Sequence, residues 1–379
     1  FPYTTLFRSL EVESLLDLAC VRYDSSNLTY HYRSENEELI DFSNYAFYEG
    51  KLQIAPNITK NIGKRPIERI KVDGKWINRK NLAEAKEVVQ TLKKIFKSRK
   101  NNETIGIITF NAEQEMAIED LIDKECRLDE KFKADILRET NRKQNGEDTS
   151  LFIKNIENVQ GDERDIIIFS IGYAENEYGK VIAHFGPLSM EGGENRLNVA
   201  ITRAKKKIYV ITSIEPEELK VDGTKNLGPK MFKNYLRYVR AVSNGDKLEA
   251  SVILDAYVQN VVKDNENVLN NGVIENEICE ELKQLGYDVE LNVGNSVYKI
   301  GLAIYDRALD RYLVGIECDY KSFYSSVSAM ERDVLRPAFW ESRGWNIVRV
   351  WSREWWLNKG KVLNKIISMA EKEKEKIIS

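Results

Sequence analysis

The chain has 379 residues, with 57 Lys or Arg against 60 Asp or Glu, so its formal net charge is −3. This length suits two or three domains, and 42% hydrophobic with 31% charged residues is typical of folded globular domains. The near-balanced charge excludes a basic field over the whole chain, so a cationic surface for nucleic acid would have to be local.

Cysteine and histidine usage narrows the chemistry further. The four cysteines are far apart, without a CxxC pair, and there are only two histidines. This pattern argues against zinc sites, a disulfide framework and histidine-rich metal chemistry. No apolar run is long enough to span a membrane and no signal peptide opens the chain. We therefore expect no membrane partner and a reducing, cytoplasmic setting.

The first nine residues, FPYTTLFRS, stand apart from the rest and include no initiator Met. They resemble the in-frame translation of a short-read sequencing adapter; an edge strand containing Tyr3 and Phe7 is the alternative. We expect residues 1–9 to be an artefact, the protein's own sequence to begin near Leu10, and an N-terminal part to be absent.

Residues 10–214 alternate strand and helix patterns. Residues 104–110, 165–170 and 207–212 are short runs rich in β-branched side chains, which predicts buried strands. Residues 81–99 carry apolar side chains at helical spacing. Ser34 and Glu37 have the spacing of a capping box, which predicts a helix running toward Phe47. This alternation predicts an α/β fold with a doubly wound parallel sheet.

A second unit follows a polar stretch and a predicted linker. We expect a helical extension and linker over residues 215–272, with helices at 229–242 and 248–262, and a smaller α/β domain over 273–358. Gly286 and Gly344 are placed to end helices over 274–285 and 328–343. Strands are predicted at 288–293, 298–305, 312–319 and 345–351, and a solvated helix at 359–379.

Three arginines occur where an open parallel sheet binds ligands. Arg33 precedes the predicted capped helix, and Arg196 and Arg203 are seven residues apart on one predicted helix, which would put them on one face. Guanidinium groups gathered there would suit phosphate, because they form bidentate charge-assisted hydrogen bonds. The alternative is that each is an ordinary surface or ion-pair residue.

Three segments carry a resemblance to a known family. HYRS (31–34), VQGDERD (159–165) and LNVAITRAK (197–205) resemble motifs IV, V and VI in the second RecA-like domain of superfamily 1 helicases. The similar branch includes RNA-surveillance and DNA-replication helicases, and IGIITFNAEQ (105–114) resembles its strand and turn that touch the nucleic-acid backbone. The resemblance covers roughly residues 10–212.

The resemblance implies roles for individual residues. Arg33 and Arg203 would be catalytic arginine fingers that reach the γ-phosphate of ATP. Thr109 and Gln114 would face the nucleic-acid backbone. The other implied nucleotide-binding residues are Tyr32 near the adenine, Gln160, Gly161, Glu163 near the ribose, and Arg196. For Tyr32 a core aromatic is the alternative, and for Gly161 a plain turn glycine.

The sequence contains no GxxxxGK[ST] phosphate loop and no early Asp-Glu pair for Mg²⁺. In the family both lie in a first RecA-like domain, upstream of motif IV. The resemblance therefore implies a parent protein that uses ATP and Mg²⁺, with a first RecA-like domain as partner of this chain. We expect the 379-residue chain alone not to hydrolyse ATP.

Residues 273–358 resemble very-short-patch mismatch repair endonucleases and the broad PD-(D/E)xK fold, on VYKIGLAIYDRALDRYLVGIECDYKSFYSS (297–326) and MERDVLRPAFWESRGWNIVRVWSREWW (330–356). Glu317 and Asp319 are two apart on a predicted strand, so both would point to one face and could hold catalytic Mg²⁺ or Mn²⁺. The chain departs from the family at Gly301, where an Asp is usual, and at Tyr324, where a His is frequent.

Two hypotheses follow for this second domain. It is a degraded nuclease kept for nucleic-acid binding or packing, or it still cuts by recruiting Asp306 or Glu277, with Lys321 near the phosphate. Alternatively, Glu317 and Asp319 form ion pairs with Arg332 or Arg349. Lys321 and Arg353 are candidate phosphate contacts, Trp345 and Trp351 are predicted core residues, and Trp355 and Trp356 remain open between core and base stacking.

The sequence therefore predicts the C-terminal part of an ATP-dependent DNA or RNA helicase with an appended endonuclease-like domain. A non-catalytic nucleic-acid-binding module and a metal-dependent endonuclease are the alternatives. Single-stranded or duplex nucleic acid is the expected partner.

Overall fold

The computed structural model describes residues 15–24, 28–60, 65–99, 102–144, 146–182, 185–258, 272–296, 298–319 and 328–378. The chain forms two compact units, residues 1–30 and residues 31–379. The first contains helix α2 (Leu15–Cys20), and the features discussed below belong to the second. The adapter-like residues 1–9, most of the predicted linker, Lys321 and Tyr324 lie outside the described residues. Within the described ranges, no helix is long and apolar enough to cross a membrane.

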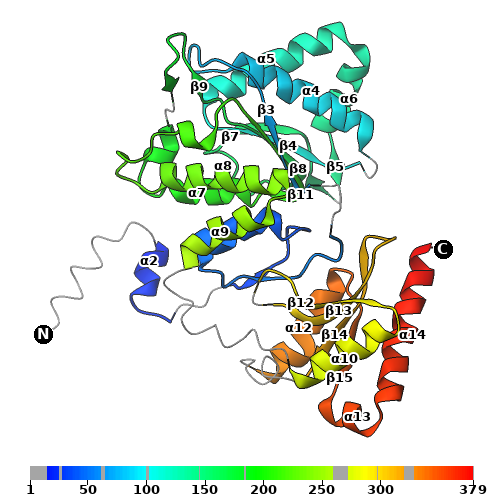
Figure 1. Cartoon of the computed structure of the whole chain (residues 1–379). Coiled ribbons are helices and arrows are strands. Elements are labelled where there is room, and N and C mark those ends of the chain that lie inside the picture. The colour runs from blue at the N-terminus through cyan, green and yellow to red at the C-terminus, as the bar shows by residue number, and fades with distance from the viewer. Residues whose placement is uncertain are drawn as a thin grey trace, which may run out of the picture. The chain divides into compact units, whose positions relative to one another are not determined.

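Five parallel strands form the larger sheet, in the spatial order β3-β11-β8-β4-β7 (Figure 1). They are β3 (Ile67–Lys71), β11 (Ala204–Thr212), β8 (Arg164–Ser170), β4 (Ile105–Thr109) and β7 (Phe152–Asn155). The predicted α/β fold with a parallel sheet is confirmed.

Helices cover both faces of this sheet because its central strands are apolar on both sides. Ile107 and Ile168 pack into a core with α4 (Leu82–Ser98), α5 (Ala112–Leu128) and α6 (Glu130–Thr140). Their chain neighbours Ile108, Ile167 and Phe169 point the other way, into the core on the opposite face. The helices contributing to that second core are α3 (Glu38–Tyr48), α7 (Gly193–Ile201), α8 (Gly228–Asn244) and α9 (Lys247–Val258).

Helix α4 begins as the sequence predicts, whereas α3 does not. The Asn81 side chain caps α4 by accepting a hydrogen bond from the Glu84 N–H at 3.2 Å. The predicted capping box of Ser34 and Glu37 is absent, because α3 starts at Glu38 without a side-chain cap. Ser34 Oγ instead donates to the Ala204 carbonyl, so a tertiary contact replaces the local cap.

A second sheet has the order β12-β13-β14-β15, with its last pair parallel and the others antiparallel. The strands are β12 (Asp288–Val293), β13 (Ile300–Asp306), β14 (Arg311–Cys318) and β15 (Ile347–Val350). The accompanying helices are α10 (Val273–Gln284), a π-helical turn (Glu331–Leu335) leading into α12 (Arg336–Ser342), α13 (Ser352–Leu357) and α14 (Lys359–Ile378). We refer to residues 272–378 as the endonuclease-like domain.

The tryptophans of this domain divide differently from the prediction. Trp345 is buried as expected, but Trp351 is 43% exposed because the chain leaves the sheet there and turns into α13. Trp355 is buried with its Nε1 donating to Glu277, and Trp356 is 61% exposed. The prediction for Trp351 is therefore wrong.

Several short elements are also described. They are β1 (Tyr30–His31), β2 (Gln53–Ile54), β5 (Lys143–Gln144), β6 (Glu147–Asp148), β9 (Ala174–Glu175), β10 (Val181–Ile182) and the 3-10 turns Gly186–Ser189 and Pro216–Glu218.

Candidate functional site

Three chain segments meet at the amino ends of β8 and β11, and not at the carboxyl edge where open parallel sheets usually bind ligands and where the sequence placed them. The loop of residues 31–37, which we call the Arg33 loop, is joined to the start of β11 by a 2.7 Å hydrogen bond from the Glu35 N–H to the Lys205 carbonyl. The Arg164 N–H donates to the Arg203 carbonyl at 3.1 Å, which ties the segment before β8 to the one before β11. The three motifs are therefore adjacent in space, although the first and the third are 170 residues apart in sequence.

Glu163 lies at the centre of this site. Its carboxylate forms an ion pair with Arg33 Nε and a second one with Lys205 Nζ at 2.7 Å. Partial burial opposes ionisation, but hydrogen bonds from Lys205 and Arg33 outweigh it and lower the pKa of Glu163. The carboxylate is therefore charged at neutral pH and holds the Arg33 guanidinium in place.

Arg203 projects toward the same site from the short segment between α7 and β11. Its Nε donates to the Val199 carbonyl at 2.7 Å and its Nη1 to the Asp162 carbonyl at 3.4 Å. Burial and the nearby Arg33 charge lower the pKa of Arg203. Two guanidinium groups that repel each other in a partly buried edge are suited to an anion placed between them.

The predicted pairing of Arg196 with Arg203 on one helix is wrong. Helix α7 ends at Ile201, because the chain must extend to enter β11 at Ala204. Arg196 lies in the first turn of α7 and its Nη1 donates to the Pro187 carbonyl at 3.2 Å. The structure brings Arg33, Arg203 and Glu163 together, and Arg196 points to a different neighbour.

The remaining sequence-predicted nucleotide residues are exposed around the site. Tyr32 is 75% exposed, which excludes the alternative of a core aromatic. Gln160 is exposed, and Gly161 has φ +89° with open space where a side chain would project. The positive φ is sufficient to explain why a glycine occurs here, which favours the alternative of a plain turn glycine.

His31 is a residue of the site that sequence reasoning did not single out. Its Nε2 accepts a hydrogen bond from the Ser34 N–H at 3.0 Å, which closes the Arg33 loop on itself. Burial, together with the charges of Arg33 and Arg343, lowers the pKa of His31 to about 4, so the ring is neutral and available as an acceptor. Its one sequence signal is its position two residues before Arg33.

Thr109 and Gln114 lie inside the domain at the opposite, carboxyl edge of the sheet. Thr109 Oγ1 donates to the Asn111 carbonyl at 2.9 Å, and Gln114 Nε2 donates to the Asn81 carbonyl and to Ser170 Oγ. Both residues are fully buried, so neither side chain presents a surface to nucleic acid. Their hydrogen bonds connect strand ends and a helix cap.

Glu84 completes this internal network and was not predicted. Its carboxylate accepts hydrogen bonds from the Gly172 N–H at 2.7 Å and from Ser170 Oγ at 3.1 Å. Burial raises the pKa of Glu84 to about 7. The residue is completely enclosed, so its role is structural.

In the endonuclease-like domain, a glutamate takes the space left by Gly301. A side chain built at Gly301 would place its Cβ 2.9 Å from Glu275 Oε1 on α10, and the Gly301 N–H donates to Glu317 Oε1 at 3.3 Å. Burial raises the pKa of Glu275, and burial raises that of Glu317 to about 7. Sequence reasoning missed Glu275, although it shares the buried helix face of Ile278, Cys279 and Leu282.

The two carboxylates proposed as substitutes in this site are engaged elsewhere. Asp306 pairs with Lys374 at 2.9 Å and accepts from the turn amides that follow it. Glu277 pairs with Lys359 at 2.7 Å. Asp306 ends β13 and Gly301 is its second residue, so the length of the strand separates them. The alternative hypothesis that Asp306 or Glu277 replaces the missing acid is therefore wrong.

The remaining charged groups also differ from expectation. Asp319 follows β14, and its Oδ1 accepts from the Ser352 N–H at 2.6 Å. Arg332 and Arg349 both form ion pairs with Asp333, and Arg349 also acts electrostatically on Glu317. Among the described residues, no three His, Cys, Asp or Glu side chains are grouped so that they could hold a metal ion. Arg353 is exposed on α13.

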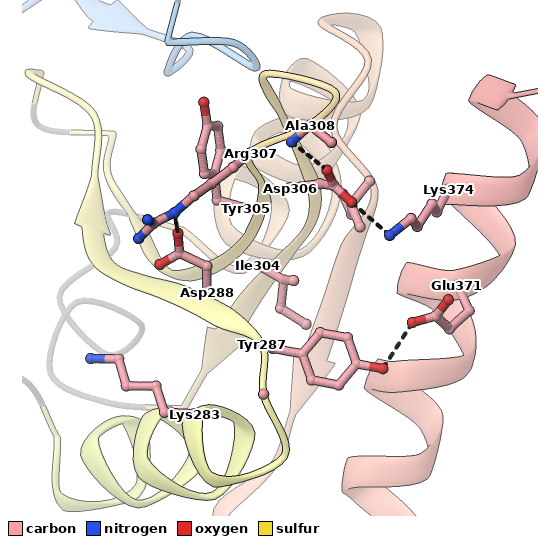
Figure 2. Close-up of a pocket in the computed structure, with 12 residues that line it drawn as sticks. Lys283, Tyr287, Asp288, Ile304, Tyr305, Asp306, Arg307, Ala308, Glu371 and Lys374 are labelled. Atoms are coloured by element: carbon pink, nitrogen blue, oxygen red, sulfur yellow. Dashed lines mark hydrogen bonds and ion pairs between the residues drawn. The ribbon is translucent and has the colours of Figure 1, made fainter.

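A surface cavity of about 600 Å³, drawn in Figure 2, lies at the carboxyl end of β13, whereas Gly301 is near the amino end of that strand. Two ion pairs line it, Arg307 with Asp288 at 2.6 Å and Lys374 with Asp306 at 2.9 Å, and the Tyr287 hydroxyl donates to Glu371 at 2.9 Å (Figure 2). All of the lining residues fall within residues 283–374 of the endonuclease-like domain, so this cavity contains none of the three helicase-like motifs and is not the candidate site.

Comparisons with known proteins agree with this two-part organisation. The AAA domain family matches residues 4–215, and the endonuclease-like family REase_MTES_1575 matches residues 274–369. A Mycoplasma pneumoniae protein named as an uncharacterized ATP-dependent helicase, the MG140 homolog, is 33% identical over 360 residues, covering 92% of this chain and 30% of that protein. The MG140 protein of Mycoplasma genitalium, named likewise, is 34% identical over 348 residues, covering 90% of this chain and 29% of its own length.

A solved structure, the C-terminal domain of a possible DNA helicase from Lactobacillus plantarum, is 17% identical with a TM-score of 0.25, and covers 51% of this chain and 94% of that one. The chain spans about 30% of the length of the two Mycoplasma relatives. Since the AAA family match extends over more than half of the residues, the chain belongs to the AAA domain family, in the form typical of superfamily 1 helicases, and carries an endonuclease-like domain behind it.

Proposed function

We propose that this chain is the second RecA-like half of an ATP-dependent helicase that moves along DNA or RNA. The observation that carries the proposal is the meeting of Arg33, Glu163 and Arg203 at one sheet edge. The names of the Mycoplasma relatives and the larger size of those proteins support it. A first RecA-like domain in the longer protein would bind ATP with Mg²⁺.

In this proposal the chain contributes positive charge to the γ-phosphate. Arg33 and Arg203 stabilise the charge that develops on the transferred phosphoryl group. Glu163 holds Arg33 in the absence of nucleotide, and the phosphate competes with Glu163 for the same guanidinium. Tyr32 and Gln160 are exposed and so remain candidate nucleotide contacts, whereas Arg196 is turned to the Pro187 carbonyl.

The test is ATP hydrolysis by a longer protein that contains this sequence and a phosphate-loop domain. Arg33→Ala and Arg203→Ala should each lower kcat by roughly 1,000-fold or more, with a smaller effect on KM. Arg307→Ala, a surface arginine of the endonuclease-like domain, is the matched control and should leave both constants unchanged. Normal kcat in the two finger variants would refute the assignment.

For the endonuclease-like domain we propose nucleic-acid binding without cleavage. Mg²⁺ or Mn²⁺ would require Glu317 and Asp319 to face a common ion. Glu317 is turned to the Gly301 amide and Asp319 to Ser352, so these groups do not fit a metal as they stand. Exposed Arg353 is the described candidate phosphate contact, and Lys321 remains a candidate from the sequence alone.

A further inference from the structure

The Arg33 loop is held from two sides. On the sheet side, Ser34 Oγ donates to the Ala204 carbonyl at 3.2 Å and the Glu35 N–H donates to the Lys205 carbonyl at 2.7 Å. On the other side it meets the endonuclease-like domain, which comes more than 250 residues later in the chain. The loop that presents the arginine finger is therefore a junction between two domains.

Asn295, in the turn between β12 and β13, makes three polar contacts with this junction. Its N–H donates to Glu37 Oε1 at 2.6 Å, its Nδ2 donates to Asp41 Oδ2 at 3.2 Å, and its carbonyl accepts from the Tyr45 hydroxyl at 3.1 Å. Glu37 and Asp41 are 4% and 2% exposed. Hydrogen bonds to buried carboxylates are costly to break, because the desolvated oxygen would lose its donor.

The segment after α3 extends the same contact. Asn57 Oδ1 accepts from the Glu37 N–H at 2.8 Å, which ties this segment to the Arg33 loop. The segment then binds the endonuclease-like domain: Ser296 Oγ donates to the Ile54 carbonyl at 2.8 Å and Trp345 Nε1 to the Pro56 carbonyl at 2.8 Å. The Tyr312 N–H donates to the Ile58 carbonyl at 2.9 Å. Main-chain carbonyls accept all three of these hydrogen bonds, so the contact fixes the position of the backbone of this segment.

Arg343, at the end of α12, places a positive charge beside the loop. Its guanidinium acts electrostatically on Glu35 and on His31. Arg343 Nη2 is buried and has no hydrogen-bond partner within the described ranges. The Arg33 loop therefore carries the one acidic side chain, Glu35, whose charge acts on Arg343 in the described part of the chain.

We infer that the endonuclease-like domain positions the arginine finger, with Asn295 and Arg343 as positioning residues for Arg33. The inference rests on the proposed function, because Arg33 must be the residue that reaches the phosphate. Its consequence is that ATP hydrolysis depends on a domain that need not cut nucleic acid. Displacement of a catalytic group by about 1 Å can cost about 100-fold in rate, so a shift of the loop would suffice.

The first experiment measures hydrogen exchange in the 379-residue chain and requires no ATPase activity. Arg343→Ala and Glu37→Gln should each speed exchange of the Glu35 and Glu37 amides by about tenfold, a local opening without global unfolding. Arg343→Lys should restore much of the protection, and Arg307→Ala should change nothing. Amides of β4 and β13 report whether both domains remain folded. Unchanged protection at Glu35 and Glu37 in both variants would overturn the inference.

The second experiment places the same variants in the longer protein. Arg343→Ala should lower kcat for ATP by about 100-fold with little change in KM, and Arg343→Lys should recover part of it. No hydrolysis by the unmodified longer protein would refute the proposed function, while the exchange result would still decide whether the domain holds the loop. Normal kcat with a loosened loop would refute the positioning role alone.

Discussion

Arg33 and Glu163, 130 positions apart in the chain, form an ion pair at the amino edge of the parallel sheet. Both side chains are partly open to solvent, and Lys205 binds the other oxygen of the same carboxylate. The ion pair thus holds the Arg33 guanidinium in a defined position while leaving it partly exposed. An arginine held in this way is preorganised and still free to exchange its partner for a phosphate.

Glu163→Gln tests how firmly this ion pair holds the loop. Partly exposed ion pairs contribute little, so we expect the free energy of unfolding to fall by less than about 1 kcal/mol. Urea denaturation of the variant beside the exposed control Glu177→Gln measures the difference. A loss several times larger would mean that the carboxylate is a structural centre of the three motifs.

Glu84 should make the larger domain less stable as pH rises. Its pKa is raised to about 7 in the folded protein from the ordinary 4.5, so the folded state binds more protons than the unfolded state between these values. Unfolding free energy therefore falls with increasing pH across about 4.5 to 7, by about 3 kcal/mol in total for a fully buried group.

Thermal denaturation between pH 5 and 8 measures this effect. The Glu84→Gln variant keeps an acceptor for the Gly172 N–H but cannot ionise, so its transition temperature should vary less with pH than that of the parent protein. An identical pH profile in parent and variant would show that another group is responsible. Glu177→Gln should reproduce the parent profile.

Restoring the family's acid at position 301 should destabilise the endonuclease-like domain. In Gly301→Asp the new Cβ would lie 2.9 Å from Glu275 Oε1, and the side chain would add a third carboxylate beside Glu317. We therefore expect the free energy of unfolding to fall by about 1–3 kcal/mol. Glu275→Ala removes the obstacle. The double variant should therefore be more stable than the sum of the two single changes predicts, and an additive double-mutant cycle would contradict the contact.

The purified chain should bind nucleic acid without cutting it. We expect no cleavage of single-stranded or duplex DNA with Mg²⁺ or Mn²⁺, no difference in Glu317→Ala, and binding that weakens as salt rises. Gel assays with both DNA forms measure these outcomes. Cleavage that disappears in Glu317→Ala would establish a working nuclease and reverse the proposal for this domain.

Much of the fold was determined by local sequence pattern. The strand β12 was predicted with its observed bounds, and α4 within one residue at each end, because side-chain periodicity and caps are local properties. The alternation of strand and helix patterns along residues 10–214 likewise predicted the parallel sheet. These features need no knowledge of distant contacts.

Only the tertiary structure decided which side chains lie in the candidate sites and which are buried elsewhere. Arg203 leaves the helix of Arg196 because α7 must stop for β11 to begin, and Gln114 is buried because it meets Ser170 from another strand. Glu275, not Glu277, faces Gly301, since helix packing selects which side of α10 is inside. The hydrogen bond from Asn295 to Glu37 joins residues 258 positions apart. It arises from packing between domains, which no local sequence pattern encodes.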